Sequence, residues 1–256
     1  GGLSKLVIGM KNSVRELYGG LPQDFADKIV SEDTGFLYNY SNVTHNGTLY
    51  GVHNTGIYAY SGGTLPNKFE YDIVSKFDYN LIGANGAISY NNDILFSLAG
   101  DVLLLDKKSE VDAWTLFKGI DAIYFAELNN ELYIVNGAGV ISKWKGIDDL
   151  GSAINYKLTT KVFTNNSIAN KQRLYKMYII ANIPTGSNMR IYLSKSIDEN
   201  DWELVNTVNG GDVGVQRVLV PVGKYALENF IRIKLEGSGY VKLYEINRQF
   251  RTLPLV

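Results

Sequence analysis

A recurring hairpin pattern is the feature that most constrains how this chain can fold. Four stretches each open with a leucine, pass through a short polar or glycine-containing turn and return as a second apolar run. They begin at Leu6, Leu49, Leu95 and Leu132, with separations of 43, 46 and 37 residues. A period of roughly 40–50 residues is typical of four-stranded propeller blades, whereas a parallel β-helix repeats over a shorter length.

Turn-forming residues support the same interpretation. Asn46-Gly47, Asn91-Asn92 and Asn129-Asn130 stand just before three of the four leucines. Asn-Gly pairs favour the type I′ turn of a two-residue hairpin, and the chain has three more of them, at Asn85-Gly86, Asn136-Gly137 and Asn209-Gly210. The sequence therefore predicts many short antiparallel strands joined by tight turns.

The repeat predicts an all-β protein with a propeller-like region over residues 1–152 that holds at least four hairpin repeats. A blade buries its faces only against neighbouring blades, so such a region builds radially. Four units are the lower limit of the usual four to eight blades, and the chain starts almost inside the first hairpin. We therefore expect earlier blades to be missing. An ordinary antiparallel β protein with pseudo-repeats is the open alternative.

The pattern changes near Ile154, where longer strands with strict alternation begin. In Ile231–Leu235, for example, apolar residues alternate with Arg232 and Lys234, as expected for strands with one buried and one solvated face. Residues 153–256 are thus predicted to form an antiparallel β-sandwich. Helix is scarce, and the best candidate is the stretch from Pro22 to Val30.

The composition excludes several kinds of chemistry. The chain of 256 residues has no cysteine, two histidines and a formal net charge of −1, so disulfides and thiolate catalysis are excluded and a structural zinc site has only His45 and His53 to use. Both histidines are expected at turns or on the surface. No apolar run reaches the roughly 18 residues that a membrane-spanning helix needs, and we expect no membrane span.

Motifs for catalysis are missing from the sequence. It contains no nucleophile elbow, phosphate loop or dinucleotide fingerprint. The carboxylates that lie closest in sequence are Asp24/Asp27, Asp148-Asp149 and Glu199/Asp201. They fall in predicted loops or near the short helix, where aspartate ordinarily caps a turn. We therefore predict that the chain is not an enzyme and has no catalytic, cofactor-binding or metal-binding residues.

Two basic stripes have the composition of a phosphate-binding surface. Lys171, Arg173 and Lys176 are interleaved with Tyr175 and Tyr178. A second stripe near the carboxyl end consists of Lys242, Arg248 and Arg251. Basic residues alternating with aromatic ones can follow a nucleic-acid backbone, although mixed solvent-exposed faces explain both stripes more simply.

Three stretches resemble a known family. The run from Leu6 to Phe25 contains Asn12-Ser13-Val14 and Tyr18-Gly19 followed by Pro22, Asp24 and Phe25. It resembles the propeller of tail nozzle and tail stabilisation proteins from short-tailed bacteriophages. The hairpin Gly56–Gly63 is similar to one of theirs, and 241–254 resembles the closing strand of the domains that follow such propellers.

This resemblance implies a virion structural protein that assembles as a ring around the DNA exit channel. It further implies contact with other tail proteins, passage of DNA through the ring, and a place in the phage tail after a soluble stage in the host cytoplasm. It supplies no catalytic residues. Two alternatives stay open: a carbohydrate-binding module in which Tyr58, Tyr60 and Trp144 stack on sugars, and a propeller glycoside hydrolase that uses loop carboxylates.

Overall fold

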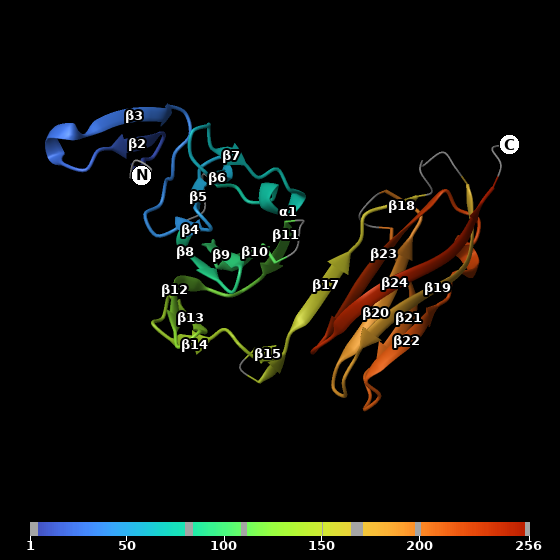
Figure 1. The fold of residues 1–256 in the computed structure, drawn as a ribbon. Coiled ribbons are helices and arrows are strands. Elements are labelled where there is room, and N and C mark those ends of the chain that lie inside the picture. Colours follow the sequence, from blue (N-terminus) through green and yellow to red (C-terminus); the bar gives the residue numbers. More distant parts are fainter. Residues whose placement is uncertain are drawn as a thin grey trace. The chain divides into compact units, whose positions relative to one another are not determined.

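The computed structural model consists almost entirely of β-strands and forms two compact units, residues 1–145 and 146–256 (Figure 1). It describes residues 5–79, 84–108, 112–149, 151–164, 171–197 and 201–253. The predicted all-β class, a propeller-like region followed by a sandwich, is confirmed. The units divide at 145/146 rather than at 152/153, so the small hairpin of β15 (Asp148–Asp149) and β16 (Ser152–Ala153) groups with the second unit.

Four antiparallel sheets make up the first unit, and we call them blades 1 to 4. Blade 1 contains β1 (Lys5–Gly9), β2 (Val14–Tyr18) and β3 (Ala26–Ser31), and blade 2 contains β4 (Val43–His45), β5 (Thr48–His53), β6 (Gly56–Tyr60) and β7 (Asn67–Lys68). Blade 3 contains β8 (Ala84–Tyr90), β9 (Asp93–Leu98), β10 (Asp101–Asp106) and β11 (Ala113–Phe117), and blade 4 contains β12 (Ala122–Leu128), β13 (Glu131–Asn136) and β14 (Ile141–Lys143). A short helix, α1 (Asp72–Ser75), follows blade 2.

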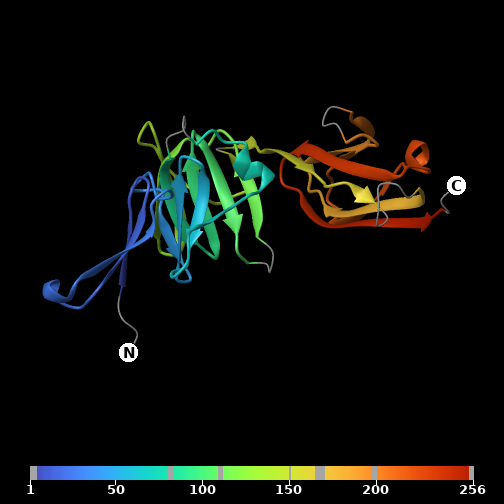
Figure 2. The same cartoon turned by 90° about the horizontal axis from the view of Figure 1, so that it is seen from above.

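The blades pack face to face in chain order. Strand β8 contacts β4 on one side and β12 on the other, so the first strands of blades 2, 3 and 4 are successive neighbours. Figure 2 shows the sheets of this unit side by side, with blade 1 (blue) at one end of the stack. This is the arrangement of adjacent propeller blades.

Alternation along each strand assigns side chains to the two neighbouring blades. In β9, Ile94, Phe96 and Leu98 are buried against blade 2, whereas Leu95 is buried against blade 4. Successive residues of a strand point to opposite faces, so one strand contributes to two cores. The middle blades are apolar on both faces because both faces are covered.

The turns are only partly those that the sequence predicts. Asn46-Gly47, Asn91-Asn92 and Asn129-Asn130 all have positive φ and form tight turns between paired strands. Asn85-Gly86, in contrast, lies within β8 at a bulge. Asn209-Gly210 follows β21 and joins strands of different sheets, and a Cβ at Gly210 would come within 1.8 Å of the Pro184 carbonyl oxygen. That glycine is needed for close backbone approach, not for a hairpin.

The predicted helix over Pro22–Val30 is wrong. Only a 3-10 turn, η1 (Pro22–Asp24), forms there, and β3 begins at Ala26. Strand β3 pairs with β2 from Tyr18↔Ala26 to Val14↔Ser31. Pairing with a neighbouring strand satisfies the backbone over this stretch, and the apparent helical spacing is overridden by tertiary structure.

The second unit is an antiparallel sandwich of two sheets, as predicted. One sheet has the order β17-β23-β20-β21 with β18 also on β23, and the other has the order β22-β19-β24. The strands are β17 (Asn155–Thr159), β18 (Phe163–Thr164), β19 (Gln172–Asn182), β20 (Asn188–Ser194), β21 (Glu203–Asn209), β22 (Val215–Val220), β23 (Phe230–Ser238) and β24 (Lys242–Thr252), with a 3-10 turn η2 (Gly223–Tyr225). Their inward residues, such as Met177, Ile191 and Ile233, form one core.

The turn between β9 and β10 allows a stability test. Ala99 has φ of 52° and its side chain is exposed, in a backbone region that is unfavourable for residues with a Cβ other than Asn or Asp. Ala99→Asn should therefore raise the free energy of unfolding by about 0.5–1 kcal/mol, measured by denaturant unfolding.

A paired substitution of opposite sign is the control for this prediction. Asn92 has φ of 63° and is also exposed, so Asn92→Ala should lower the free energy of unfolding by a similar amount. Equal signs for the two substitutions would contradict the role of the left-handed backbone.

Candidate assembly interface

The outer flank of blade 1 is an apolar sheet face that none of the described blades covers. Val14 of β2 is buried against Tyr58 and Tyr60 of blade 2. Successive residues of a strand point to opposite faces, so the residues that alternate with Val14 along β2 face away from blade 2. The register places these residues together on that outer flank: Leu6, Ile8, Leu17 and Ile29. Leu6, Ile8 and Ile29 are exposed. Blade 1 thus presents to solvent a face of the kind that blades 2 and 3 bury.

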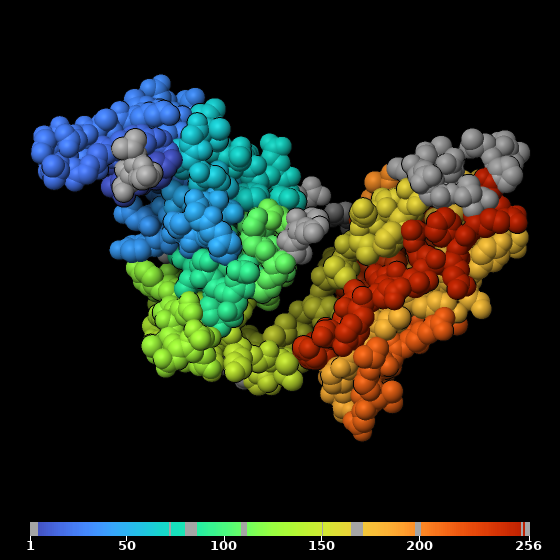
Figure 3. Space-filling view, in the orientation of Figure 1, coloured from blue at the N-terminus to red at the C-terminus, as the bar shows by residue number. Residues whose placement is uncertain are grey.

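The outer flank of blade 4 is its counterpart. Leu132 and Ile134 of β13 are buried against blade 3, so the alternate residues of that strand face away. The register groups these apolar residues on the outer flank: Leu128, Tyr133, Val135 and Ile141. Tyr124 is in register with them, but its ring packs edge-on against Tyr40 at a centroid distance of 5.5 Å. Figure 3 shows blade 1 (blue) and blade 4 (yellow-green) at opposite ends of the first unit, with blades 2 and 3 between them.

The contact between blades 1 and 2 shows what a covered flank looks like. The Glu16 carboxylate of β2 is fully buried; it forms a salt bridge with Lys5 and accepts hydrogen bonds from Tyr18 and from Tyr60 of blade 2, the last at 2.5 Å. These donors lower the pKa of Glu16 to about 2. Burial, with the nearby Glu16 carboxylate adding to it, raises the pKa of Tyr60. Tyr60 therefore fastens blade 2 to blade 1 through a charge-assisted hydrogen bond.

A cluster of the same composition lies on the uncovered flank of blade 4. Glu131 forms a salt bridge with Lys143 and accepts a hydrogen bond from Tyr133 at 3.1 Å. Lys143, and to a lesser degree Tyr133, lower the pKa of Glu131. The side chain of Glu131 is 33% exposed, whereas that of Glu16 is 0% exposed. Among the described residues, the partners of Glu131 are Tyr133, Lys143 and, at 3.9 Å, Lys145, and none of them comes from a neighbouring blade.

The sequence predicts no site residues, and neither flank is evident from it. One signal was available, because the tripeptide Glu-Leu-Tyr occurs at 16–18 and again at 131–133. In both copies the glutamate and tyrosine share the face that is turned toward the next blade in chain order. The repeat unit thus includes a polar cluster as well as an apolar face.

The two histidines take separate partners. His45 of β4 interacts through Nδ1 with Ser89 Oγ of β8 at 2.8 Å, which links blades 2 and 3. His53 interacts through Nδ1 with Thr55 Oγ1 at 2.9 Å, and burial lowers its pKa. Both are buried, so the expectation of a surface position is wrong. The expectation of a turn position holds, because each histidine is the last residue of its strand before a two-residue turn. The structure assigns them to packing.

Two of the three carboxylate pairs lie within the residues that the structure describes, and their members take separate positions. Asp148 and Asp149 are consecutive residues of β15 and therefore point to opposite faces. Asp27 forms a salt bridge with Arg15 across β2 and β3, while Asp24 belongs to η1. Glu199 lies outside the described residues. Among the residues that the structure describes, no group of three or more histidines and acidic residues could hold a metal ion.

The aromatic residues proposed for stacking on sugars are also occupied. Tyr58 and Tyr60 are buried between blades 1 and 2. Trp144 is half-buried and packs edge-on against Phe117 at a centroid distance of 4.8 Å. Tyr58 and Tyr60 therefore have no exposed ring face for a sugar, whereas Trp144 stays partly exposed.

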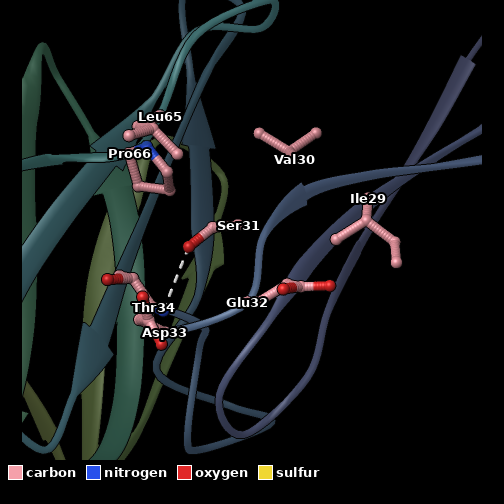
Figure 4. A pocket seen from close by; sticks show the side chains of 8 residues that line it. All are labelled: Ile29, Val30, Ser31, Glu32, Asp33, Thr34, Leu65 and Pro66. Atoms are coloured by element: carbon pink, nitrogen blue, oxygen red, sulfur yellow. Dashed lines mark hydrogen bonds between the residues drawn. The ribbon is translucent and has the colours of Figure 1, made fainter.

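One hollow lies beside blade 1. It has a volume of about 470 Å³ and is bounded by Ile29 and Val30 of β3 on one side and by Leu65 and Pro66 on the other (Figure 4). The loop after β3 completes it, where Ser31 Oγ accepts a hydrogen bond from the Thr34 amide at 3.0 Å. The acidic side chains of this loop are exposed to solvent. The hollow thus lies beside β3 of blade 1. Its described lining residues do not form a cluster of catalytic or metal-binding side chains.

Within the described ranges, no helix has the length and apolar character needed to span a bilayer. No protein-family model matches the chain, and no curated protein matches it. A solved structure that is similar to it is a glycoside hydrolase family 43 arabinoxylan arabinofuranohydrolase from Bacillus subtilis in complex with cellotetraose. It shares 11% identity at a TM-score of 0.22, over 91% of this chain and 59% of the enzyme. The chain thus spans about three fifths of that protein, and the likeness carries no argument about function.

The Glu16 cluster makes stability depend on pH. The folded-state pKa of Glu16 is about 2, below the ordinary value of 4.5. Its contribution is therefore present above pH 4.5 and lost as the pH falls toward 2. Glu16→Gln should give a shallower loss of unfolding free energy over this window than the wild type shows, measured by denaturant unfolding at several pH values.

Tyr60→Phe is the companion variant for this prediction. It removes one donor to Glu16 and should raise the folded-state pKa of Glu16. The contribution of Glu16 to the free energy of unfolding should then be smaller and be fully lost at a higher pH. An unchanged pH dependence in Glu16→Gln would contradict the assigned pKa.

Proposed function

We propose that this chain is a structural component of a bacteriophage tail, of the nozzle type, which assembles with further copies of itself into a ring. The observation that carries the proposal is the pair of uncovered apolar flanks at opposite ends of the blade array. The resemblance of 6–25 and 56–63 to tail nozzle proteins supplies the biological setting. The role is mechanical, and we assign no catalytic residue.

The two flanks fit each other by the rule that already operates inside the chain. Between blades 3 and 4, a face turned toward the next blade, with Leu95 and Val102, is covered by a face turned toward the previous blade, with Leu132 and Ile134. On blade 4, the face turned toward the next blade is uncovered. On blade 1, the face turned toward the previous blade is uncovered. A second copy placed end to end therefore continues the stack with the same type of contact.

The charges of the flanks are compatible with this contact. On blade 1, Arg15 pairs with Asp27. On blade 4, Glu131 pairs with Lys143 and, at 3.9 Å, with Lys145, whose side chain is 73% exposed to solvent. Joining the faces buries no isolated charge, which would otherwise oppose association strongly. A carboxylate placed on either flank would remove this advantage.

The test uses one charged substitution on each flank. Leu6→Glu and Ile141→Glu should each weaken self-association on the order of tenfold or more, measured by native mass spectrometry and sedimentation of the purified chain. Val213→Glu in the second unit is the matched control, because Val213 is 69% exposed and Ile141 is 68% exposed. The control should assemble like the wild type.

Mixing the two variants tests the end-to-end geometry. Leu6→Glu retains an intact blade 4 flank, and Ile141→Glu retains an intact blade 1 flank, so an equimolar mixture should form a dimer of one of each and nothing larger. A wild-type chain that stays monomeric, or flank variants that assemble as well as the Val213 control, would overturn the proposed self-assembly.

A further inference from the structure

The two basic stripes of the second unit come together on one sheet face. Strands β19 and β24 are neighbours, and Arg173 stands directly opposite Arg251. Arg217 of β22 stands opposite Ile180, on the same outward face as Arg173, because Met177 and Ile179 between them point into the core. We call this surface the basic face; its cationic residues are Arg173, Lys176, Arg217, Lys242 and Arg251, and all are exposed.

One residue of the second stripe, Arg248, does not lie on the basic face. It packs over the Phe163 ring at 4.4 Å, and burial lowers its pKa. Its guanidinium therefore belongs to the interior side of β24 and takes no part in the basic face.

The charge of the basic face is unbalanced. Among the described residues, none of its five cations takes part in a salt bridge. The one carboxylate on the face, Glu245 opposite Ile180, accepts a hydrogen bond from Asn247. Like charges directly opposite on adjacent strands, as for Arg173 and Arg251, oppose folding. The chain as a whole carries a net charge of −1, so this excess is local.

Aromatic rings lie among the cations and contact three of them, Lys242 being 5.0 Å from the centroid of the Tyr244 ring. The Arg217 guanidinium lies 3.7 Å from the centroid of the Tyr178 ring, and that of Arg173 lies 5.7 Å from the Tyr175 ring. A stacked guanidinium keeps its N–H edge free for phosphate oxygens. Tyr175 is itself 49% exposed and offers a ring face to an unpaired base.

We infer that the basic face binds the sugar-phosphate backbone of DNA without sequence preference. Phosphates would supply the negative charge that the face lacks, and arginine suits their geometry better than lysine does. The inference rests on the second unit alone and does not depend on the flanks of the blades.

The experiment measures DNA binding by the purified full chain. Fluorescein-labelled single-stranded and duplex DNA of arbitrary sequence are titrated at several salt concentrations, and anisotropy is recorded. Wild type should bind both. The logarithm of its binding constant should fall linearly with the logarithm of the salt concentration. The triple variant Arg173→Gln/Arg217→Gln/Arg251→Gln should bind at least tenfold more weakly at low salt, with a salt slope smaller by about one for each lost contact.

A charge-matched triple variant is the control. Lys157→Gln/Lys161→Gln/Arg190→Gln removes the same charge from exposed positions outside the basic face. It should keep most of the binding. Equal weakening by both triple variants would show a generic charge effect and overturn the inference, as would wild type that binds vesicles of phosphatidylglycerol but not DNA.

Thermal unfolding separates loss of function from loss of structure. Because Arg251→Gln relieves repulsion from Arg173, this variant alone should leave the unfolding midpoint unchanged or raised while weakening DNA binding. A lowered midpoint, or unaltered DNA affinity in the folded variant, would contradict the assignment.

Discussion

The first unit depends on one constraint: each of its sheets has two faces that require cover, and most of this cover comes from a neighbouring sheet. A strand such as β9 sends Ile94 and Phe96 to one neighbour and Leu95 to the other. A blade between two others is therefore stable in a way that a terminal blade is not. The polar contacts follow the same rule. The fully buried Glu16 accepts a hydrogen bond across a blade boundary from Tyr60, whereas the described partners of Glu131 come from blade 4 and from Lys145 just after it.

Local chemistry made much of the fold predictable. The Asn-Asn and Asn-Gly turns before the repeated hairpins were identified because left-handed backbone has few compatible residues. Strict alternation similarly identified most sandwich strands, although β21 was missed because Glu203–Asn209 mixes polar and apolar residues on both faces. The repeat was less accurate in detail. Leu95 points toward the next blade whereas Leu132 points toward the previous one, so the aligned leucines are not structurally equivalent.

The surfaces that matter for function were harder to predict, because they depend on which segments become neighbours. The hairpin from Leu6 has the same apolar composition as the hairpins whose faces are buried, so its sequence does not indicate which of its faces stays exposed. The two basic stripes lie near opposite ends of the sandwich sequence. The pairing of β19 with β24 brings Arg173 and Arg251 together. The burial of Tyr58 and Tyr60 has the same origin, since hairpin composition alone does not distinguish an aromatic core from an aromatic platform.

The blade array has a direction, and this has a geometric consequence for any assembly that it forms. Its two ends are different surfaces, so copies joined end to end make a heterologous contact that always leaves one free end of each kind unless the chain of copies returns to its start. The rotation from one copy to the next, set by the twist between neighbouring sheets, decides whether that return occurs and after how many copies. Subunit number would then be a property of blade geometry, and a small change in packing between two sheets could convert a closed ring into an open helix.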